Sequence, residues 1–60
     1  MTLYDLLNKI NLDSEIQILD NDGYLLQEGK RGPTMWEDDL IDKEVYMIIP
    51  GIVTKIVLER

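Results

Sequence analysis

The sequence predicts a small α+β domain in which two short helices and two β-hairpins alternate in the order αββαββ, with the strands in a small antiparallel sheet. Three observations lead to this fold class. Apolar residues recur at helical spacing near the start of the chain, they alternate with polar residues from position 15, and two turn signals each separate a pair of strand-like segments. A chain of 60 residues has room for a single domain, residues 1–60.

The first helix is expected at residues 3–10. Thr2 has the residue type of an N-cap and Asp5 stands at the third helical position, which together form the pattern of a capping box. The apolar residues of this stretch share one helical face: Leu3, Leu6, Leu7 and Ile10. Asn11 and Asp13 follow, and because their side chains favour turns, the helix should end there.

The first hairpin is expected from strands at residues 15–20 and 24–28. Ile16 and Ile18 alternate with polar residues in the first strand, and Asp-Asn-Asp-Gly at residues 20–23 supplies a turn that lets the strands pair antiparallel. The same turn resembles a fragment of a calcium-binding loop, but residues without carboxylates stand at the other ligand positions. We therefore interpret it as a hairpin turn.

The second helix is expected to begin at Met35 and to end near Lys43. Thr34 followed three positions later by Glu37 has the capping-box pattern, and Trp36 should lie on the apolar face. The solvent-exposed face would carry the acidic residues Glu37, Asp38, Asp39 and Asp42. Complementation of the helix dipole explains this acidic run better than a metal or acid–base cluster does.

The second hairpin is expected from strands at residues 45–49 and 52–58, which are rich in β-branched residues and are joined by Pro50-Gly51. A loop of only these two residues would put Val45, Met47 and Ile49 on one face of the sheet, with Tyr46 and Ile48 on the other. A wider loop with a shifted register stays open, because the type II turn that Pro-Gly favours matches the twist of a hairpin less well than the primed turns do.

Self-association of the chain is expected. With neither Cys nor His, it has no disulfide and no zinc site to stabilise so small a core. The second face of the last hairpin also carries aliphatic side chains where a one-sided sheet would keep polar ones. The expected interface residues are Tyr46, Ile48, Val53 and Val57. The two short helices or a second copy would cover them, and we favour a dimer or higher oligomer.

The charge balance excludes some partners. Twelve acidic and six basic residues give a net charge of −6, which disfavours direct binding to nucleic acids and to anionic lipid surfaces. It would favour a basic protein surface, including one that normally holds nucleic acid. The absence of Cys and of a secretory signal pattern leads us to expect a cytoplasmic protein. The longest apolar run, residues 45–49, is too short for a membrane span.

Catalysis is not expected. The absence of His and Cys removes the commonest general base, the thiol nucleophile and most transition-metal sites. Ser14 is the only serine, and no Gly-x-Ser-x-Gly pattern surrounds it. We therefore expect a protein that is not an enzyme and that needs no metal and no cofactor.

Residues 29–34 form the candidate ligand site. They contain the only adjacent basic pair, flanked by two glycines that let backbone N–H groups turn outward, and they lead into the expected second helix. Arg31 could bind an anion through two parallel hydrogen bonds, and Trp36 could stack on a ring. The expected ligand-binding residues are Gly29, Lys30, Arg31, Gly32, Thr34 and Trp36. The alternative is a solvated loop whose charges pair with Glu28 or Glu37, with Trp36 in the core.

The layout of apolar and turn residues carries a resemblance along the whole chain. Its parts are Thr-Leu-x-Asp-Leu-Leu-x-Lys-Ile at residues 2–10, Ile-x-Ile at 16–18 with Asp20 and Gly23, Asp-Leu-x-Asp at 39–42, the strand and proline at 45–50, and Ile-Val-Leu at 56–58. Together they resemble small uncharacterised proteins encoded by phages and prophages of gut Firmicutes. The resemblance implies an accessory protein, several kinds of which block host defence by holding a host protein or sequestering a nucleotide signal.

The function expected from the sequence is therefore that of a non-catalytic, homo-oligomeric binding protein in the host cytoplasm. It would act against host defence by sequestering a phosphate-bearing, nucleotide-like ligand at residues 29–34. The alternative is an acidic inhibitor or adaptor that occupies a host protein surface, in the manner of a nucleic-acid mimic.

Overall fold

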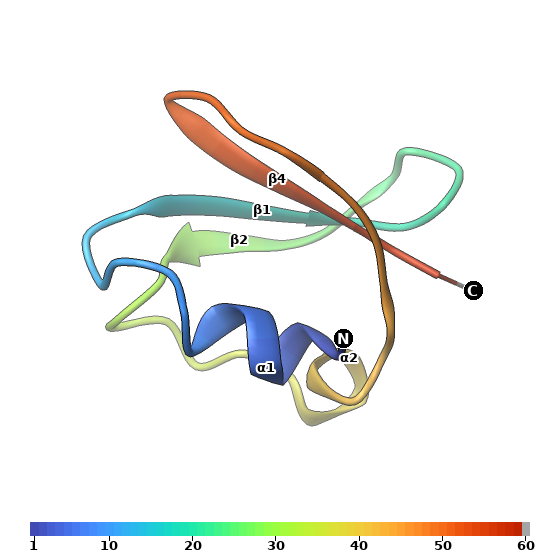
Figure 1. The fold of residues 1–60 in the computed structure, drawn as a ribbon, viewed down its shortest axis with the longest axis horizontal. Coiled ribbons are helices and arrows are strands. Elements are labelled where there is room, and N and C mark those ends of the chain that lie inside the picture. The colour runs from blue at the N-terminus through green and yellow to red at the C-terminus, as the bar shows by residue number, and fades with distance from the viewer. Residues whose placement is uncertain (60) are drawn as a thin grey trace.

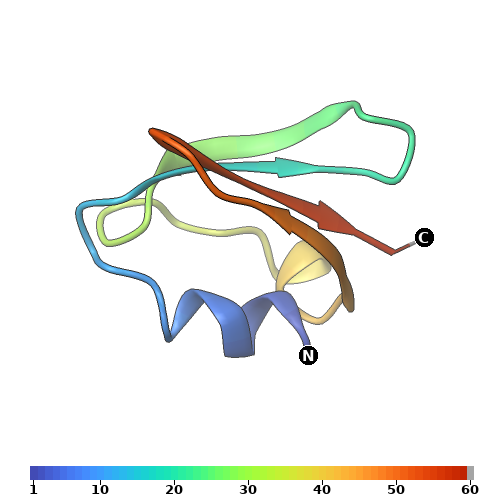
Figure 2. The same ribbon diagram turned by 45° about the horizontal axis from the view of Figure 1, so that its top comes forward.

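The computed structural model of the protein describes residues 1–59 and confirms the order αββαββ. In chain order the elements are α1 (Leu3–Leu7), β1 (Glu15–Leu19), β2 (Leu25–Lys30), α2 (Asp38–Ile41), β3 (Val45–Ile49) and β4 (Val53–Leu58). The strands form one sheet in the order β2-β1-β4-β3, and both helices lie on the same side of it (Figures 1 and 2). The described part of the chain is thus an α+β domain of two layers.

The sheet is mixed rather than wholly antiparallel. β1 and β2 pair antiparallel, as do β3 and β4, so both predicted hairpins are confirmed. β1 and β4 lie side by side and run parallel, with Ile16 opposite Thr54 and Ile18 opposite Ile56. Parallel neighbours require a long connection between them. Within this connection, the segment from β2 to β3, which includes α2, crosses from one edge of the sheet to the other on the helical side.

Helix α1 begins as predicted and ends earlier. The Thr2 hydroxyl accepts a hydrogen bond from the backbone N–H of Asp5 (3.2 Å), and the Asp5 carboxylate accepts one from the backbone N–H of Thr2 (3.4 Å), which confirms the capping box. The helix ends at Leu7 instead of residue 10. The N–H groups of Lys9 and Ile10 donate to carbonyls three residues back, which is the tighter turn that often closes a helix.

The prediction for the second helix is wrong at its start. α2 begins at Asp38, and its N-cap Glu37 makes no capping hydrogen bond, so Thr34 caps no helix. The backbone of the preceding residues is held elsewhere: the Gln27 amide of β2 donates to the Met35 carbonyl (2.8 Å) and accepts from the Glu37 N–H (3.0 Å). Because these groups bond to the sheet, they are not available for a helical turn.

The second hairpin has the wider loop and not the two-residue loop. Ile48 lies opposite Ile56 and Ile49 lies opposite Lys55, and the register shifts again between Val45 and Met47. Ile48 therefore shares a face with the buried Ile56, so the two-face division expected for the two-residue loop is wrong. Because Ile49 pairs with Lys55, five residues separate the paired positions instead of the two of a tight loop, which agrees with the poor match between a type II Pro-Gly turn and the twist of a hairpin.

The core lies between the helices and the inner face of the two central strands. Its buried residues are Leu3, Leu6 and Leu7 of α1, Ile16 and Ile18 of β1, Leu40 of α2, and Ile56 and Leu58 of β4. The opposite face of the sheet is covered by no element of residues 1–59. A row of apolar residues crosses that open face in register: Leu25, Leu19, Val57 and Met47.

We expect Ile56→Ala to lower the free energy of unfolding by about 2–5 kcal/mol, because Ile56 is 0% exposed at the centre of the core. This is a large part of the total stability of a domain, about 5–15 kcal/mol. The matched control is Ile52→Ala, since Ile52 is 100% exposed, and it should change stability by less than about 0.5 kcal/mol. Urea unfolding followed by circular dichroism measures both, and equal effects would contradict this assignment of the core.

The first two residues are bound to the start of β3. Thr2 and Glu44 form an antiparallel bridge, and the Val45 N–H donates to the Met1 carbonyl (2.8 Å). The Met1 ammonium also forms an ion pair with the Glu44 carboxylate at 2.8 Å. This hydrogen bond and the charge of Glu44 raise the pKa of the Met1 amino group above its ordinary value of 8.0.

The raised pKa predicts a pH dependence of stability for the 60-residue chain with a free Met1 amino group. The ion pair stabilises the fold fully at pH values below 8.0, and this contribution is lost as the pH rises through the higher pKa of the folded state. Thermal melts across neutral to alkaline pH test it, with Glu44→Gln as the reference. The variant should be less stable than the parent at neutral pH and should approach it at alkaline pH, whereas a constant difference would contradict the prediction.

Candidate functional site

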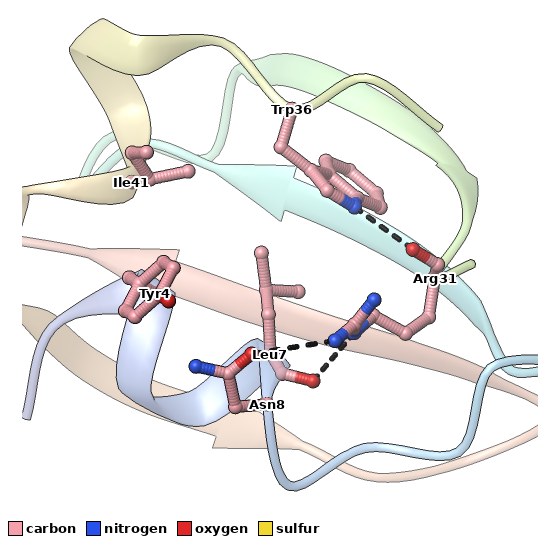
Figure 3. A pocket seen from close by; sticks show the side chains of 6 residues that line it. All are labelled: Tyr4, Leu7, Asn8, Arg31, Trp36 and Ile41. Carbon is pink, nitrogen blue, oxygen red and sulfur yellow. Dashed lines mark hydrogen bonds between the residues drawn. The ribbon is translucent and has the colours of Figure 1, made fainter. Parts of the chain in front are cut away.

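A pocket of about 280 Å³ opens between α1, the segment that follows β2, and α2. Its lining residues are Tyr4, Leu7, Asn8, Arg31, Trp36 and Ile41. Figure 3 shows Arg31 and Trp36 on one side and Tyr4 and Ile41 on the other, with Leu7 between them. The walls are mainly aromatic and aliphatic, and the only charged side chain among them is a guanidinium.

Arg31 is held against the end of α1. Its Nε–H donates to the backbone carbonyl of Leu7 (2.6 Å), and its Nη2 donates to the side-chain oxygen of Asn8 (3.5 Å). These bonds use only part of the hydrogen-bonding capacity of the guanidinium. Glu28 and Glu37 were the expected partners of the loop charges, but within residues 1–59 Arg31 forms no ion pair with either of them. The charge of Arg31 is therefore positioned by neutral oxygens and is not neutralised.

Trp36 is both a packing residue and a wall of the pocket. The indole is half-buried against the core cluster, which agrees with its interpretation as a core residue. Its Nε1–H donates to the Arg31 carbonyl (3.1 Å), so one hydrogen bond fixes the ring relative to the backbone that carries the guanidinium (Figure 3). A buried indole N–H needs such a partner. The two residues form one unit.

The backbone N–H groups of the loop do not face outward as expected. The N–H of Arg31 donates to the Ser14 carbonyl (2.9 Å), that of Gly32 to the Leu12 carbonyl (2.9 Å), and that of Thr34 to the Lys30 carbonyl (3.3 Å). Pro33 has no N–H. The first two bonds hold the loop to the chain that precedes β1 and the third closes the loop on itself, so the loop offers side chains and not these backbone donors to a ligand.

The structure brings two of the six expected ligand residues into the pocket, Arg31 and Trp36. Lys30 is the last residue of β2, lies opposite Glu15 and is exposed outside the pocket. Gly29, Gly32 and Thr34 do not line it either. A side chain at Gly29 would collide with the Thr34 hydroxyl, and one at Gly32 would lie 3.2 Å from Leu12, so both glycines permit close packing of the loop.

Four lining residues were missed by the sequence reasoning. Tyr4, Leu7 and Asn8 have the i, i+3, i+4 spacing of one helical face, and this spacing is the signal that could have found them. Leu7 was assigned to the core, where it is also buried. Ile41 comes from α2, and no local pattern connects it with α1. The pocket is made of segments that only the fold brings together.

The expected interface residues do not form one patch. Val53 and Val57 lie on the open face of β4, whereas Ile48 lies in register with Ile56 of the covered face. Tyr46 stands at the register shift of β3 and is exposed. Two different surfaces, a sheet face and a sheet edge, therefore carry these residues.

The acidic side chains of residues 1–59 are not clustered as metal ligands would be. In residues 1–59 no group of three or more His, Cys, Asp or Glu side chains is placed to hold a metal ion. The Asp20 carboxylate instead accepts the N–H groups of Asp22 and Tyr24, each at 2.9 Å, and Gly23 has a φ of 92°. These are the features of a tight turn, which confirms the hairpin interpretation.

In comparisons with known proteins, no family model, no curated protein and no solved structure matches the chain. The geometry of the pocket is therefore the basis for any functional statement. Among the helices of the described residues, none has the length and apolar character needed to cross a membrane.

The packing of Gly29 generates a prediction about the loop. Gly29→Ala should lower the free energy of unfolding by about 1–3 kcal/mol, because the new methyl group would collide with Thr34. Gly51→Ala is the control, since a methyl group there would lie 3.5 Å from its nearest neighbour, an ordinary contact. Denaturant unfolding of both variants measures the effect, and a Gly29 variant as stable as the parent would show that the loop is not packed as described.

Proposed function

We propose that the protein is a non-catalytic binding protein that sequesters a small phosphate-bearing, nucleotide-like ligand in the pocket between α1 and the segment after β2. The observation that carries the proposal is the Arg31 guanidinium, which has no carboxylate partner within residues 1–59 and stands at an otherwise apolar and aromatic pocket. A guanidinium without a counter-ion suits an anionic group, because it can form charge-assisted, paired hydrogen bonds with phosphate oxygens.

The apolar walls define the rest of the ligand. Trp36 and Tyr4 offer aromatic surfaces, and Leu7 and Ile41 add aliphatic ones. Such walls suit a ring, because burial of a flat apolar surface against aromatic side chains is favourable. The volume of about 280 Å³ lies just below the usual range of ligand pockets, which is about 300 to 1,000 Å³. We therefore expect a ligand the size of a mononucleotide, with one ring system and one anionic group.

The charge of the whole chain limits where an anion can bind. A net charge of −6 repels anions at long range, so binding must come from contacts inside the pocket and not from electrostatic steering. Arg31 supplies this contact. Lys30 adds only a solvated charge outside the pocket.

Sequestration fits the composition better than turnover does. The chain has no His and no Cys, and the pocket contains no carboxylate that could act as a general acid or base. Its resemblance to small phage-encoded proteins supports a role against host defence through removal of a nucleotide signal. In that role the ligand is held and leaves unchanged.

The proposal predicts that binding depends on Arg31 and not on its basic neighbour. Isothermal titration calorimetry with a panel of nucleoside monophosphates should detect a binder, and Arg31→Gln should weaken its binding at least about tenfold, the effect of losing one charge-assisted hydrogen bond. Lys30→Gln removes the same charge one residue away and should leave the affinity within about twofold. Circular dichroism confirms that both variants fold.

Two results would contradict the proposal. One is the absence of binding by any member of the panel to the parent protein at millimolar ligand. The other is equal loss of affinity in the two variants, because a nonspecific charge effect would produce it.

A second candidate is supported by the acidic surface around α2. Glu37, Asp38, Asp39 and Asp42 are all exposed, and none of them forms an ion pair within the described residues. This surface suits a basic patch on a host protein, including one that binds nucleic acid. The two candidates differ in their sensitive residues, since Asp38→Asn with Asp39→Asn would weaken a protein complex and leave the pocket intact.

A further inference from the structure

Strand β3 forms one edge of the sheet and is unusually exposed for an apolar strand. In the order β2-β1-β4-β3 it pairs only with β4, so along residues 46–49 the other side of its backbone faces no strand of the described chain. The exposed fractions of its side chains are high: Tyr46 57%, Met47 46%, Ile48 44% and Ile49 42%. A backbone edge with unpaired N–H and C=O groups is a template for a further strand.

The other edge of the sheet is protected, and this contrast gives the β3 edge its significance. β2 carries the charged residues Glu28 and Lys30, and its Gln27 binds the segment at Met35 and Glu37. Charges and covering segments are the usual means by which edge strands avoid other chains. β3 has neither along residues 46–49. No charged residue lies between Glu44 and Lys55, and within the described residues no strand lies beyond β3.

We infer that β3 pairs antiparallel with β3 of a second copy, so that two sheets join edge to edge into one continuous sheet. A strand satisfies the unpaired backbone groups, and this strand must itself be uncharged and apolar on both faces, since Met47 and Ile48 point to opposite faces of the sheet. The β3 of another copy has these properties by identity. Antiparallel pairing of two identical strands has a two-fold axis, which is the symmetry of a closed dimer.

The extent of the contact is limited at both ends. Residues 1–2 already occupy the edge beside Glu44 and Val45, and the register shift between Val45 and Met47 twists the strand there. At the other end of the strand, Pro50 stops the ladder of hydrogen bonds, since it has no N–H to donate. The free ladder therefore covers residues 46–49, which suits a weak dimer. Growth beyond the dimer by edge pairing would need the charged β2 edge, so pairing of β3 with β3 closes the assembly at two copies.

The charges of the chain agree with this geometry. Two copies with a charge of −6 each repel one another, but the uncharged strand places no like charges directly across the contact. The dimer should therefore become tighter as the salt concentration rises. The pocket of Tyr4 and Arg31 does not include any residue of β3, so the inference is independent of the proposed function.

Sedimentation equilibrium over a wide concentration range tests the inference. The parent protein should change from 7.0 kDa towards twice this mass as its concentration rises. Ile48→Lys puts a charge on the edge strand at a half-exposed position and should weaken dimerisation at least about tenfold. Val57→Lys puts the same charge on the open face of the central strand β4 and should leave the dimer in place.

A second measurement does not depend on whether a variant folds. Amide hydrogen exchange of the parent protein, followed by NMR at low and high concentration, should show the N–H groups of residues 46–49 that face away from β4 gaining protection as the dimer forms. A monomeric mass at every concentration would overturn the inference. It would also be overturned if β3 bound peptides from other proteins and did not bind a second copy of the chain. Dissociation by Val57→Lys and not by Ile48→Lys would also overturn it, because that pattern indicates stacking of the open faces.

Discussion

The parallel pairing of β1 with β4 is the contact on which the rest of the structure depends. It joins two hairpins whose outer strands never meet, and it places Ile16 and Ile18 beside Ile56 and Leu58, all of them buried. Each such side chain contributes about 1.5–3 kcal/mol when it leaves water. An isolated two-stranded hairpin is at best marginally stable, so neither hairpin should persist without the other. Sheet and core therefore form together.

The same pairing creates the pocket. Since β1 and β4 are the two central strands, the chain must travel from β2 at one edge of the sheet to β3 at the other, on the side where α1 lies. This passage carries Arg31 and Trp36 past the end of α1. The hydrogen bonds of the loop to Leu12 and Ser14, together with that of Arg31 to Leu7, then fix its course. These hydrogen bonds tie one wall of the pocket to the chain before β1 and to the end of α1.

The amount of helix explains why so much apolar surface stays outside. α1 has five residues and α2 has four, and they cover only one face of the sheet. The open face keeps its apolar row, and the β3 edge keeps its exposed side chains. A small domain cannot bury all of its large aliphatic residues, and surfaces of this kind are where other molecules bind. The pocket and the β3 edge share no residue, so the proposed ligand binding and the proposed dimerisation would not compete.

The sequence by itself determined the parts of this fold that rest on contacts between near neighbours. The capping box of α1 and the Asp20 turn were predictable because their hydrogen bonds span only a few residues. The type and order of the six elements were predictable from the spacing of apolar residues and from the turn signals between them. The sequence also named Arg31 and Trp36, but among six candidate ligand residues, of which only these two line the pocket.

Only the tertiary structure decided the remaining features. The parallel pairing of β1 with β4, the wide loop after β3, the late start of α2 and the place of Tyr4 in the pocket all depend on segments far apart in sequence. The groups around Met35 illustrate this, because they bond to Gln27 and not within a helical turn. Such competition depends on which elements meet in the folded chain, and no local pattern records it.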